Sequence, residues 1–555
     1  MPKLTIDNQE IEFKPGQTII EAARQAAIDI PHFCWHPALS VSGNCRICLV
    51  EVEKMPKLVI ACSTPAAEGM VVHTKSEKTV HAQNAVMEFL LINHPLDCPI
   101  CDEAGECKLQ DYAYKYSVGT SRYDEQKNHK DKRVSLGPNV MFDGERCISC
   151  SRCIRYCAEV VGEPQLTFVQ RGEHVTIETF PGKELDNPYS MNVIEICPVG
   201  ALTSKEFRFK ARVWDMSFTG TVCPGCARGC NTRMGVRNNE VLRIEPRENL
   251  DVNQYWLCDY GRLETIKNLT DKELRFSSPM LRTDSSNELI SVDWDEAVSH
   301  ALSELKKVNA SEILFVASPF STLEDNYALK RFAKEVFDSE NICYIPNINE
   351  NFGDEMLKKS DMTPNSNGLK ILGINAFTGE TVEKISNGSY KVVVCMNDDV
   401  SRLPGANEWL GKISSIIDIT SMKNNTSNHS KVIFPLSTYA EVNGTFVNFQ
   451  NKVQRIRPAV TTLEQERLPG EFSMSRLDKF GSHNDRWTHG ARFNARPGWK
   501  IIRQLAKVFG THFEFETSEE VFMELSNKVD GMNGYDYDTV GNEGVVIGTK
   551  PLVTA

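Results

Sequence analysis

The chain has 555 residues, of which 41% are hydrophobic and 25% charged, a composition typical of a folded globular protein and not of a disordered or collagen-like chain. At roughly 150 residues per domain, this length provides for about four domains. The 62 Lys and Arg residues against 74 Asp and Glu give a net charge of -12, which argues against a nucleic-acid partner, because nucleic-acid binding needs a basic surface.

The sequence also argues against a membrane-spanning protein. No stretch reaches the roughly 18 consecutive apolar residues of a spanning helix. Residues 1–6 begin directly with a strand-like alternation and lack the basic, apolar and small-residue regions of a signal peptide. We therefore expect a cytoplasmic protein that associates with a membrane only through its partners.

The first 140 residues predict a small mixed domain followed by helix and loop. Apolar residues on both sides of Asp7 and Asn8 predict two strands joined by a turn. Residues 17–27 and 79–93 carry the apolar spacing of helices. Residues 94–140 are polar, and we expect loops there.

The sequence changes character at about residue 290. Helices are predicted over 293–308 and 323–337, and strands over 313–316, 342–345, 392–396, 416–419 and 432–434. Strands that alternate with helices at this spacing predict a parallel α/β sheet. The segment from Asn527 onward is rich in Gly, Asp and Asn, and we expect it to be poorly ordered.

Cysteine is the unusual residue of this chain. Of the 18 cysteines, 16 precede residue 260, and only Cys343 and Cys395 follow. Short-spaced cysteines in a cytoplasmic protein indicate metal binding and not disulfides. Cys343 and Cys395 fall in apolar strands and are predicted to be buried residues without a metal.

The first group is Cys34, Cys45, Cys48 and Cys62, with the spacing C-x10-C-x2-C-x13-C. A close pair could belong to a zinc site. The small polar loop 40–44 would, however, let backbone N–H groups approach cluster sulfides, and the spacing is similar to that of plant-type [2Fe–2S] proteins. We interpret this group as a [2Fe–2S] site.

The second group is His94, Cys98, Cys101 and Cys107, four ligands within 14 residues. His94 could instead interact with the C-terminal end of the preceding helix, where an imidazolium suits the helix dipole. Three cysteines alone leave a four-iron cluster one ligand short. We therefore predict a [4Fe–4S] cluster with His94 as its fourth ligand.

The third group contains one cysteine too many. Cys147, Cys150, Cys153 and Cys157 follow the bacterial ferredoxin spacing, in which the fourth cysteine ligates a second cluster. Residues 187–194 lack the cysteines that a second cluster would need, whereas Cys197 precedes a proline as such ligands do. We predict one [4Fe–4S] cluster on Cys147, Cys150, Cys153 and Cys197. The alternative is that Cys157 is a ligand.

The fourth group is Cys223, Cys226, Cys230 and Cys258, with Gly or Pro in two of the gaps. We predict a third [4Fe–4S] cluster here, with zinc as the alternative. Together the four sites use 15 cysteines and His94. The chain shows no catalytic residues and no cofactor-binding residues beyond these ligands.

These motifs resemble the large iron–sulfur subunits of NADH-quinone oxidoreductase, respiratory complex I. The resemblance rests on the first group, on the run from His94 to Asp102, on the run from Cys147 to Cys153 and on the run from Cys197 to Leu202. The runs 432–435 and 440–448 resemble the molybdopterin oxidoreductase fold, and the fourth group lies where that fold places its own N-terminal cluster.

The resemblance implies a multidomain α+β and α/β protein. Its expected parts are a ferredoxin-type [2Fe–2S] domain (1–78), a His/Cys3 [4Fe–4S] domain (79–120), a ferredoxin-like [4Fe–4S] domain (140–210), a molybdopterin-oxidoreductase-type [4Fe–4S] domain (215–271), a truncated, degenerate molybdopterin-oxidoreductase-like domain (272–520) and a tail (521–555). No bound molybdopterin is expected.

The resemblance also implies a function. Electrons would pass from NADH through a flavin subunit, along these clusters, toward quinone-side iron–sulfur subunits, with ion translocation coupled elsewhere in the complex. The chain would lie at the cytoplasmic face of the inner membrane and be part of an enzyme without holding a complete active site.

Two alternatives apply to the second half of the chain. An [FeFe]-hydrogenase needs four further cysteines, and only two remain. A molybdenum-dependent formate dehydrogenase needs a metal-binding cysteine, for which Cys343 lies at a plausible distance but inside a predicted buried strand. We favour a docking role for this half.

Overall fold

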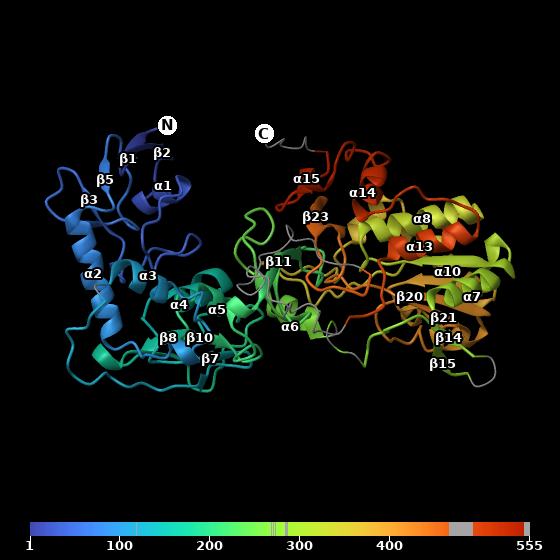
Figure 1. The fold of residues 1–555 in the computed structure, drawn as a ribbon, viewed down its shortest axis with the longest axis horizontal. Helices are drawn as coiled ribbons and strands as arrows, with labels where there is room; N and C mark the ends of the chain where they lie inside the picture. The colour runs from blue at the N-terminus through green and yellow to red at the C-terminus, as the bar shows by residue number, and fades with distance from the viewer. Residues whose placement is uncertain are drawn as a thin grey trace. The chain divides into compact units, whose positions relative to one another are not determined.

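The computed structural model describes residues 1–117, 119–267, 269, 271, 273–283, 287–464 and 492–548. It divides into two compact units, Met1–Trp214 and Asp215–Ala555 (Figure 1). Residues 465–491, inside the predicted domain 272–520, and residues 549–555 of the predicted tail lie outside the described part.

Unit 1 begins with a five-stranded sheet in the order β2-β1-β5-β3-β4. The predicted N-terminal hairpin is confirmed, because β1 and β2 pair antiparallel with Ile6 opposite Gln9, and Asp7 and Asn8 have the positive φ angles of a tight hairpin turn. The elements are β1 (Lys3–Ile6), β2 (Gln9–Glu12), α1 (Ile19–Gln25), β3 (Leu49–Val52), β4 (Val59–Ile60) and β5 (Val71–His73). Helix α1 packs Ile19, Ile20 and Ala23 onto this sheet, so the predicted helix is confirmed with shorter bounds.

The rest of unit 1 consists of short elements joined by long loops. A second predicted helix is confirmed as α2 (Glu77–Ile92). The expectation of loops over 94–140 is wrong for α3 (Lys108–Tyr116), which is a helix. The elements are η1 (Cys98–Ile100), α3 (Lys108–Tyr116), β6 (Val134–Ser135), β7 (Val140–Phe142), α4 (Arg152–Arg155), η2 (Tyr156–Val161), β8 (Leu166–Val169), η3 (Gly172–His174), β9 (Thr176–Thr179), α5 (Asn192–Ile196), β10 (Leu202–Ser204) and η4 (Val213–Asp215).

Unit 2 combines two small three-stranded antiparallel sheets with a large mostly parallel one, the latter in the order β15-β14-β21-β20-β19-β16-β17-β18. Its elements up to the large sheet's last strand are β11 (Ser217–Val222), β12 (Asn231–Arg237), β13 (Glu240–Pro246), α6 (Asp259–Lys267), β14 (Met280–Arg282), β15 (Leu289–Ser291), α7 (Trp294–Lys306), η5 (Ala310–Glu312), β16 (Ile313–Ala317), α8 (Leu323–Phe337), β17 (Ile342–Tyr344), α9 (Ser366–Ile371), β18 (Asn375–Ala376), α10 (Gly379–Ser386), β19 (Val392–Met396), η6 (Val400–Arg402), α11 (Ala406–Trp409), η7 (Leu410–Lys412), β20 (Ser415–Thr420) and β21 (Val432–Pro435).

The central strands are covered on both faces, as a parallel sheet requires. Phe315 and Val394 point into one core together with residues of α7, α8 and α13, while Leu314 and Val393 point into a second core with residues of α10 and α11. The predicted parallel α/β sheet is therefore confirmed, since β16 pairs in parallel with β17 and with β19. Cys343 and Cys395 are buried in these strands, as predicted.

The C-terminal segment corrects one expectation. The predicted disorder after Asn527 is wrong for residues 527–548, because Met532, Tyr537 and Val540 are buried in the main core of unit 2. Its remaining elements are β22 (Gly444–Val447), β23 (Lys452–Ile456), α13 (Gly498–Val508), α14 (Ser518–Ser526), α15 (Tyr537–Val540) and β24 (Val545–Val546). Gly, Asp and Asn there form turns between short buried elements, and β24 pairs with β23.

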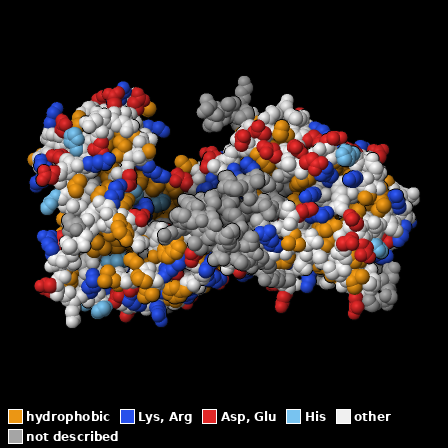
Figure 2. Space-filling model, in the orientation of Figure 1, with side chains coloured by type: hydrophobic (Ala, Val, Ile, Leu, Met, Phe, Trp, Pro, Cys, Tyr) orange, Lys and Arg blue, Asp and Glu red, His pale blue; other side chains and the backbone are white. Residues whose placement is uncertain are grey.

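Two observations concern the surface. Within the described residues, no helix is both long enough and apolar enough to cross a bilayer. On the face drawn in Figure 2, the described acidic and basic side chains are interspersed over both units and do not gather into one basic surface.

Glu324 at the start of α8 attaches the C-terminal segment to the sheet. It accepts hydrogen bonds from Thr445 and from the Tyr537 hydroxyl, at 3.0 Å. Burial raises the pKa of Glu324 to about 7 from its usual 4.5. The carboxyl group of Glu324 therefore holds its proton more tightly in the folded protein than in the unfolded chain. The stability that this protonated carboxyl contributes is full below about pH 4.5 and is lost as the pH rises through about 7.

We expect Glu324→Gln to flatten the pH dependence of stability between pH 4.5 and 7 relative to the native chain. Across this range, the free energies of unfolding of the variant and the native chain should diverge by up to a few kcal/mol, because each unit of pKa shift corresponds to about 1.4 kcal/mol. Urea midpoints measured by intrinsic fluorescence across this pH range would show it. Glu383→Gln, on the exposed face of α10, is the control, and parallel profiles for Glu324→Gln and the native chain would contradict the expectation.

Candidate metal centres

The four cysteines of the first predicted group lie together around the loop that precedes β3. The backbone N–H of Cys34 donates to Cys45 Sγ at 3.5 Å. The Cys34 thiol hydrogen-bonds to that of Cys45, and the Cys48 thiol to that of Cys62, while Cys34 also influences the pKa of both Cys48 and Cys62. Three of the four are buried, and Cys45 is partly exposed. The fold thus brings the whole group to one place.

The second group surrounds η1 and the start of α3. Cys101 is buried, Cys98 is exposed, and Cys107 is the residue that precedes α3. The thiol of Cys101 is close enough to those of Cys98 and Cys107 for electrostatic interaction. The guanidinium of Arg212 donates to the carbonyl oxygen of Cys101 at 2.5 Å and to that of Pro99. These two hydrogen bonds fix the loop that contains both residues.

His94 is the predicted non-cysteine ligand of this group. Burial, together with Lys127 and Arg146, lowers the pKa of His94 to about 4. The imidazole is therefore neutral at pH 7, the form in which histidine binds metals. Arg146 lowers the pKa of Cys101 as well, so one guanidinium acts on both residues.

The third group lines a cavity. Cys147, Cys150, Cys153 and Cys197 all contribute to its wall, and among the described residues Cys157 is not part of that lining. Cys197 follows α5, while Ser149 and Ser151 adopt left-handed backbone angles that turn the loop around the cavity. The N–H of Ser149 donates to Cys147 Sγ at 3.4 Å. The geometry therefore groups the remote Cys197 with the three closely spaced cysteines.

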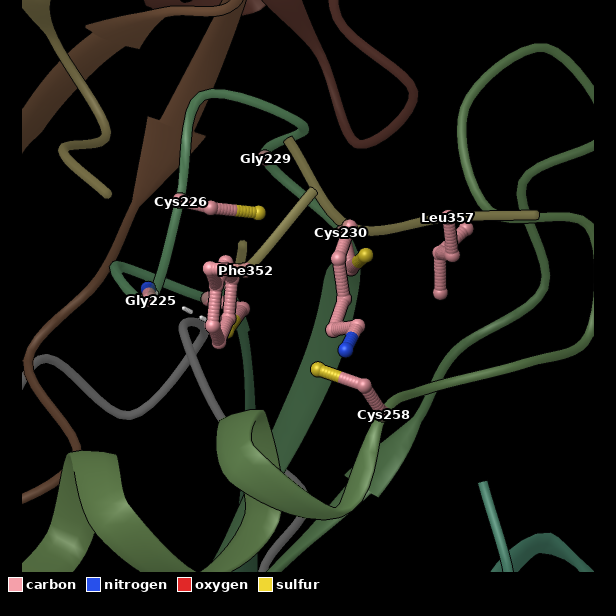
Figure 3. A pocket seen from close by; sticks show the side chains of 9 residues that line it. Gly225, Cys226, Gly229, Cys230, Cys258, Phe352 and Leu357 are labelled. Atoms are coloured by element: carbon pink, nitrogen blue, oxygen red, sulfur yellow. Dashed lines mark hydrogen bonds between the residues drawn. The ribbon is translucent and has the colours of Figure 1, made fainter. Parts of the chain in front are cut away.

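The fourth group lines a second cavity, in unit 2. Cys223, Cys226, Cys230 and Cys258 contribute to its wall, and Figure 3 shows the sulfur atoms of Cys226, Cys230 and Cys258 converging on one space. Backbone N–H groups of Gly225 and Gly261 donate to Cys223 Sγ at 3.4 Å and to Cys258 Sγ at 3.3 Å. A Cβ atom on Gly261 would lie 3.0 Å from Cys223 Sγ, so glycine lets the start of α6 approach this sulfur closely.

Sequence reasoning missed the residues that close this cavity. Phe352, Leu357 and Lys358 complete its wall, and Phe352 packs edge-on against Tyr260, with ring centroids 4.9 Å apart. These residues come from a loop almost 100 positions after Cys258, and nothing in their local sequence marks them as part of a metal site.

The chemistry of these sites suits iron–sulfur clusters. Burial raises the pKa of Cys258 to about 12 and those of Cys197 and Cys230 well above the usual value, so these thiols lose their protons only to a metal. Across the described residues, no three His, Cys, Asp or Glu side chains are grouped tightly enough to share one ion. Four thiols spaced around a cavity suit a [4Fe–4S] cluster, in which each cysteine binds a different iron.

The fold and these sites define an iron–sulfur protein with a ferredoxin-type N-terminal domain. Family models match along the chain: a 2Fe-2S iron-sulfur cluster binding domain (2–77), the NADH-ubiquinone oxidoreductase-G iron-sulfur binding region (83–122), the ferredoxin-like domain of NADH-quinone oxidoreductase subunit 3 (137–203), the molybdopterin oxidoreductase Fe4S4 domain (216–263) and molybdopterin oxidoreductase (275–368). The predicted fold class is thereby confirmed, and [2Fe–2S] and [4Fe–4S] binding domains are present.

Curated relatives point to one family. The NADH-quinone oxidoreductase G subunit of Rickettsia bellii is 42% identical over 337 residues, 60% of this chain and 48% of the relative. The mitochondrial NADH-ubiquinone oxidoreductase 78 kDa subunit of Candida albicans is 35% identical over 397 residues, 71% of this chain and 52% of the relative. The chain is thus related to the large iron–sulfur subunits of NADH-quinone oxidoreductase, as the sequence predicted, and it spans about half the length of the curated relatives it matches.

A solved structure is also similar in sequence. The NAD+-reducing [NiFe]-hydrogenase in its H2-reduced state has a chain 32% identical to this one, with 38% of this chain and 91% of that chain covered and a TM-score of 0.35.

Gly200 permits the close approach of two predicted sites. A Cβ atom at this position would lie 2.2 Å from Cys101 Sγ and 2.9 Å from the Glu103 side chain. We expect Gly200→Ala to displace Cys101 and to lower the iron content by about four atoms per chain, the content of one [4Fe–4S] cluster. Gly411→Ala is the control, because a Cβ there meets no atom within 4 Å. Full iron content in Gly200→Ala would refute the expectation.

Proposed function

We propose that the chain is an electron-transfer subunit of NADH-quinone oxidoreductase. The observation that carries the proposal is the assembly of four separate thiol groups, two of them around cavities, in a chain related to the large iron–sulfur subunits of that enzyme. Iron–sulfur clusters exchange single electrons at potentials set by their ligands and surroundings. The role of this chain is to hold such carriers, shield them from water and fix their potentials.

The proposed ligand sets are those predicted from the spacing. They are Cys34, Cys45, Cys48 and Cys62 for one [2Fe–2S] cluster, and His94, Cys98, Cys101 and Cys107, then Cys147, Cys150, Cys153 and Cys197, then Cys223, Cys226, Cys230 and Cys258 for three [4Fe–4S] clusters. The predicted domain boundaries follow these sets. The thiol contacts of the first group and the two lined cavities support this assignment.

The proposed partners are the flavin-containing, NADH-oxidising subunit and the quinone-side iron–sulfur subunits of the same complex. One surface feature supports protein partners: Cys98 is exposed beside Leu96, which is 89% exposed, and Ile100, which is 60% exposed. Exposed apolar side chains of this size next to a redox site suit a protein contact. Membrane association would then come from the partners, at the cytoplasmic face, and ion translocation would take place elsewhere in the complex.

For the second half of the chain we propose a docking role without bound molybdopterin. The alternative, a molybdenum-dependent formate dehydrogenase, would need Cys343 at a metal. Cys343 is buried in β17, between β16 and β18, and this placement does not favour that role.

Metal analysis of the anaerobically purified full chain tests the function. We expect about 14 iron atoms per chain, with electron paramagnetic resonance (EPR) signals of both [2Fe–2S] and [4Fe–4S] clusters and no stoichiometric molybdenum. About one molybdenum per chain would replace the complex I interpretation with the formate dehydrogenase one. Four zinc ions and no iron would refute electron transfer altogether.

A matched pair of cysteines tests the third ligand set. Cys157 and Cys197 are both buried, but only Cys197 lines the cavity. We expect Cys197→Ala to lose about four iron atoms and one [4Fe–4S] signal, and Cys157→Ala to keep both. The opposite pattern, with iron lost from Cys157→Ala and kept in Cys197→Ala, would make Cys157 the ligand.

A further inference from the structure

The loops that carry the first and third cysteine groups are bound to each other. The side-chain amide of Asn44 donates to the carbonyl oxygen of Ser149 at 3.1 Å. Ser40 donates through its backbone N–H at 2.8 Å and its hydroxyl at 2.5 Å to the carboxylate of Glu159. These contacts join segments more than 100 residues apart, within unit 1, and fix the two proposed cluster sites as neighbours.

Arg152 lies at this junction. Its side chain is 4% exposed, and it belongs to α4, between the proposed ligands Cys150 and Cys153. One terminal nitrogen donates to the carbonyl oxygen of Trp35, next to Cys34, at 2.5 Å, and the other donates to the carbonyl oxygen of Ile196, next to Cys197, at 3.0 Å. A single guanidinium therefore fixes the backbone beside a ligand of each site.

Within the residues that the structure describes, no carboxylate balances the positive charge of Arg152. In the described part of the chain, Asp and Glu side chains form no ion pair with it, although its guanidinium remains charged in proteins. Arg146, equally buried, is by contrast paired with Asp97 at 2.9 Å and with Asp143 at 3.4 Å. The Nε–H of Arg152 also has no hydrogen-bond acceptor among the described residues. A buried cation in this state costs free energy unless a negative group faces it.

Arg152 lies beside proposed ligands of both sites. It lines the cavity of the third group together with Cys147, Cys150, Cys153 and Cys197. Its guanidinium also donates to the carbonyl oxygen of Trp35, the residue that follows Cys34 of the first group. Arg152 thus faces two sets of prospective thiolates from one position.

We propose that Arg152 is a positioning residue that serves as the shared counter-cation of the first and third metal sites and raises the reduction potentials of both. The inference rests on the proposed function, because it requires a cluster at each site. Thiolate-bound clusters are anions that become more negative on reduction, so a fixed buried cation favours their reduced forms. One side chain then shifts the potentials of two neighbouring carriers in the same direction, which leaves the difference between them little changed.

The test compares variants of the full chain by potentiometric EPR titration. We expect Arg152→Gln to shift both the [2Fe–2S] couple and one [4Fe–4S] couple at least tenfold toward the oxidised form, which is about 59 mV for a one-electron couple. Arg152→Lys keeps the charge and should leave both equilibria within about threefold of native. Arg122→Gln, which removes an exposed arginine of the same unit, should change neither.

The outcomes separate this inference from the proposed function. If the native chain lacks the two kinds of EPR signal, the proposed function fails and the inference fails with it. If the signals are present and Arg152→Gln leaves both potentials unchanged, or if Arg152→Lys lowers them as much as Arg152→Gln does, only the role of Arg152 is refuted.

Loss of clusters is also decisive. If Arg152→Gln does not keep both clusters, Arg152→Met, which is of similar length and apolar, is measured in its place. Loss of both clusters from the two neutral variants and retention in Arg152→Lys supports a required cation. Loss from all three variants indicates a purely structural arginine and overturns the proposal.

Discussion

One constraint shapes this structure: the protein must accommodate buried negative charge at several proposed metal sites. Each proposed ligand set becomes anionic when it binds iron, and in the first, third and fourth sets most of the cysteines are buried. Burial penalises such charge unless hydrogen-bond donors or cations face it. The loops are shaped accordingly: Ser149, Gly225 and Gly261 direct backbone N–H groups at sulfur atoms, and Ser149 needs a left-handed backbone to do so. Arg146 and Arg152 supply buried positive charge in the same unit.

Much of the fold could be predicted because its elements carry regular apolar patterns. Helix α8 and strand β19 begin and end where the 3.6-residue and continuous apolar patterns predict. Helix α3 escapes prediction because it begins directly after a proposed ligand, Cys107, and buries only Leu109 and Tyr112, which is too little for a visible pattern. The C-terminal segment was judged by composition, and composition does not reveal that Tyr537 reaches a buried carboxylate.

The candidate sites also have parts that could be predicted from the sequence and parts that could not. Close cysteine spacing predicts groups directly, and the proline after Cys197 was enough to associate this residue with a group 44 positions earlier, an association that the cavity lining supports. The surroundings of the sites could not be predicted, because they come from contacts between distant segments. Gly200 against Cys101, Lys358 at the fourth cavity and Arg152 between two loops have no spacing rule that would mark them.

The contacts of the fourth group have a consequence for the order in which the protein is built. Its loop is held by residues far along the chain: the N–H of Ala227 donates to the carbonyl of Asp361, Gln454 donates to the carbonyl of Gly229, and Asn231 donates to the carbonyl of Asn542. The other three groups lie within residues 1–214, a unit of its own. Because chains fold from the N-terminus during synthesis, the three groups of unit 1 can take shape before the segments that hold the fourth, which extend as far as Asn542, have been made. We therefore expect iron to reach the fourth site later than the other three.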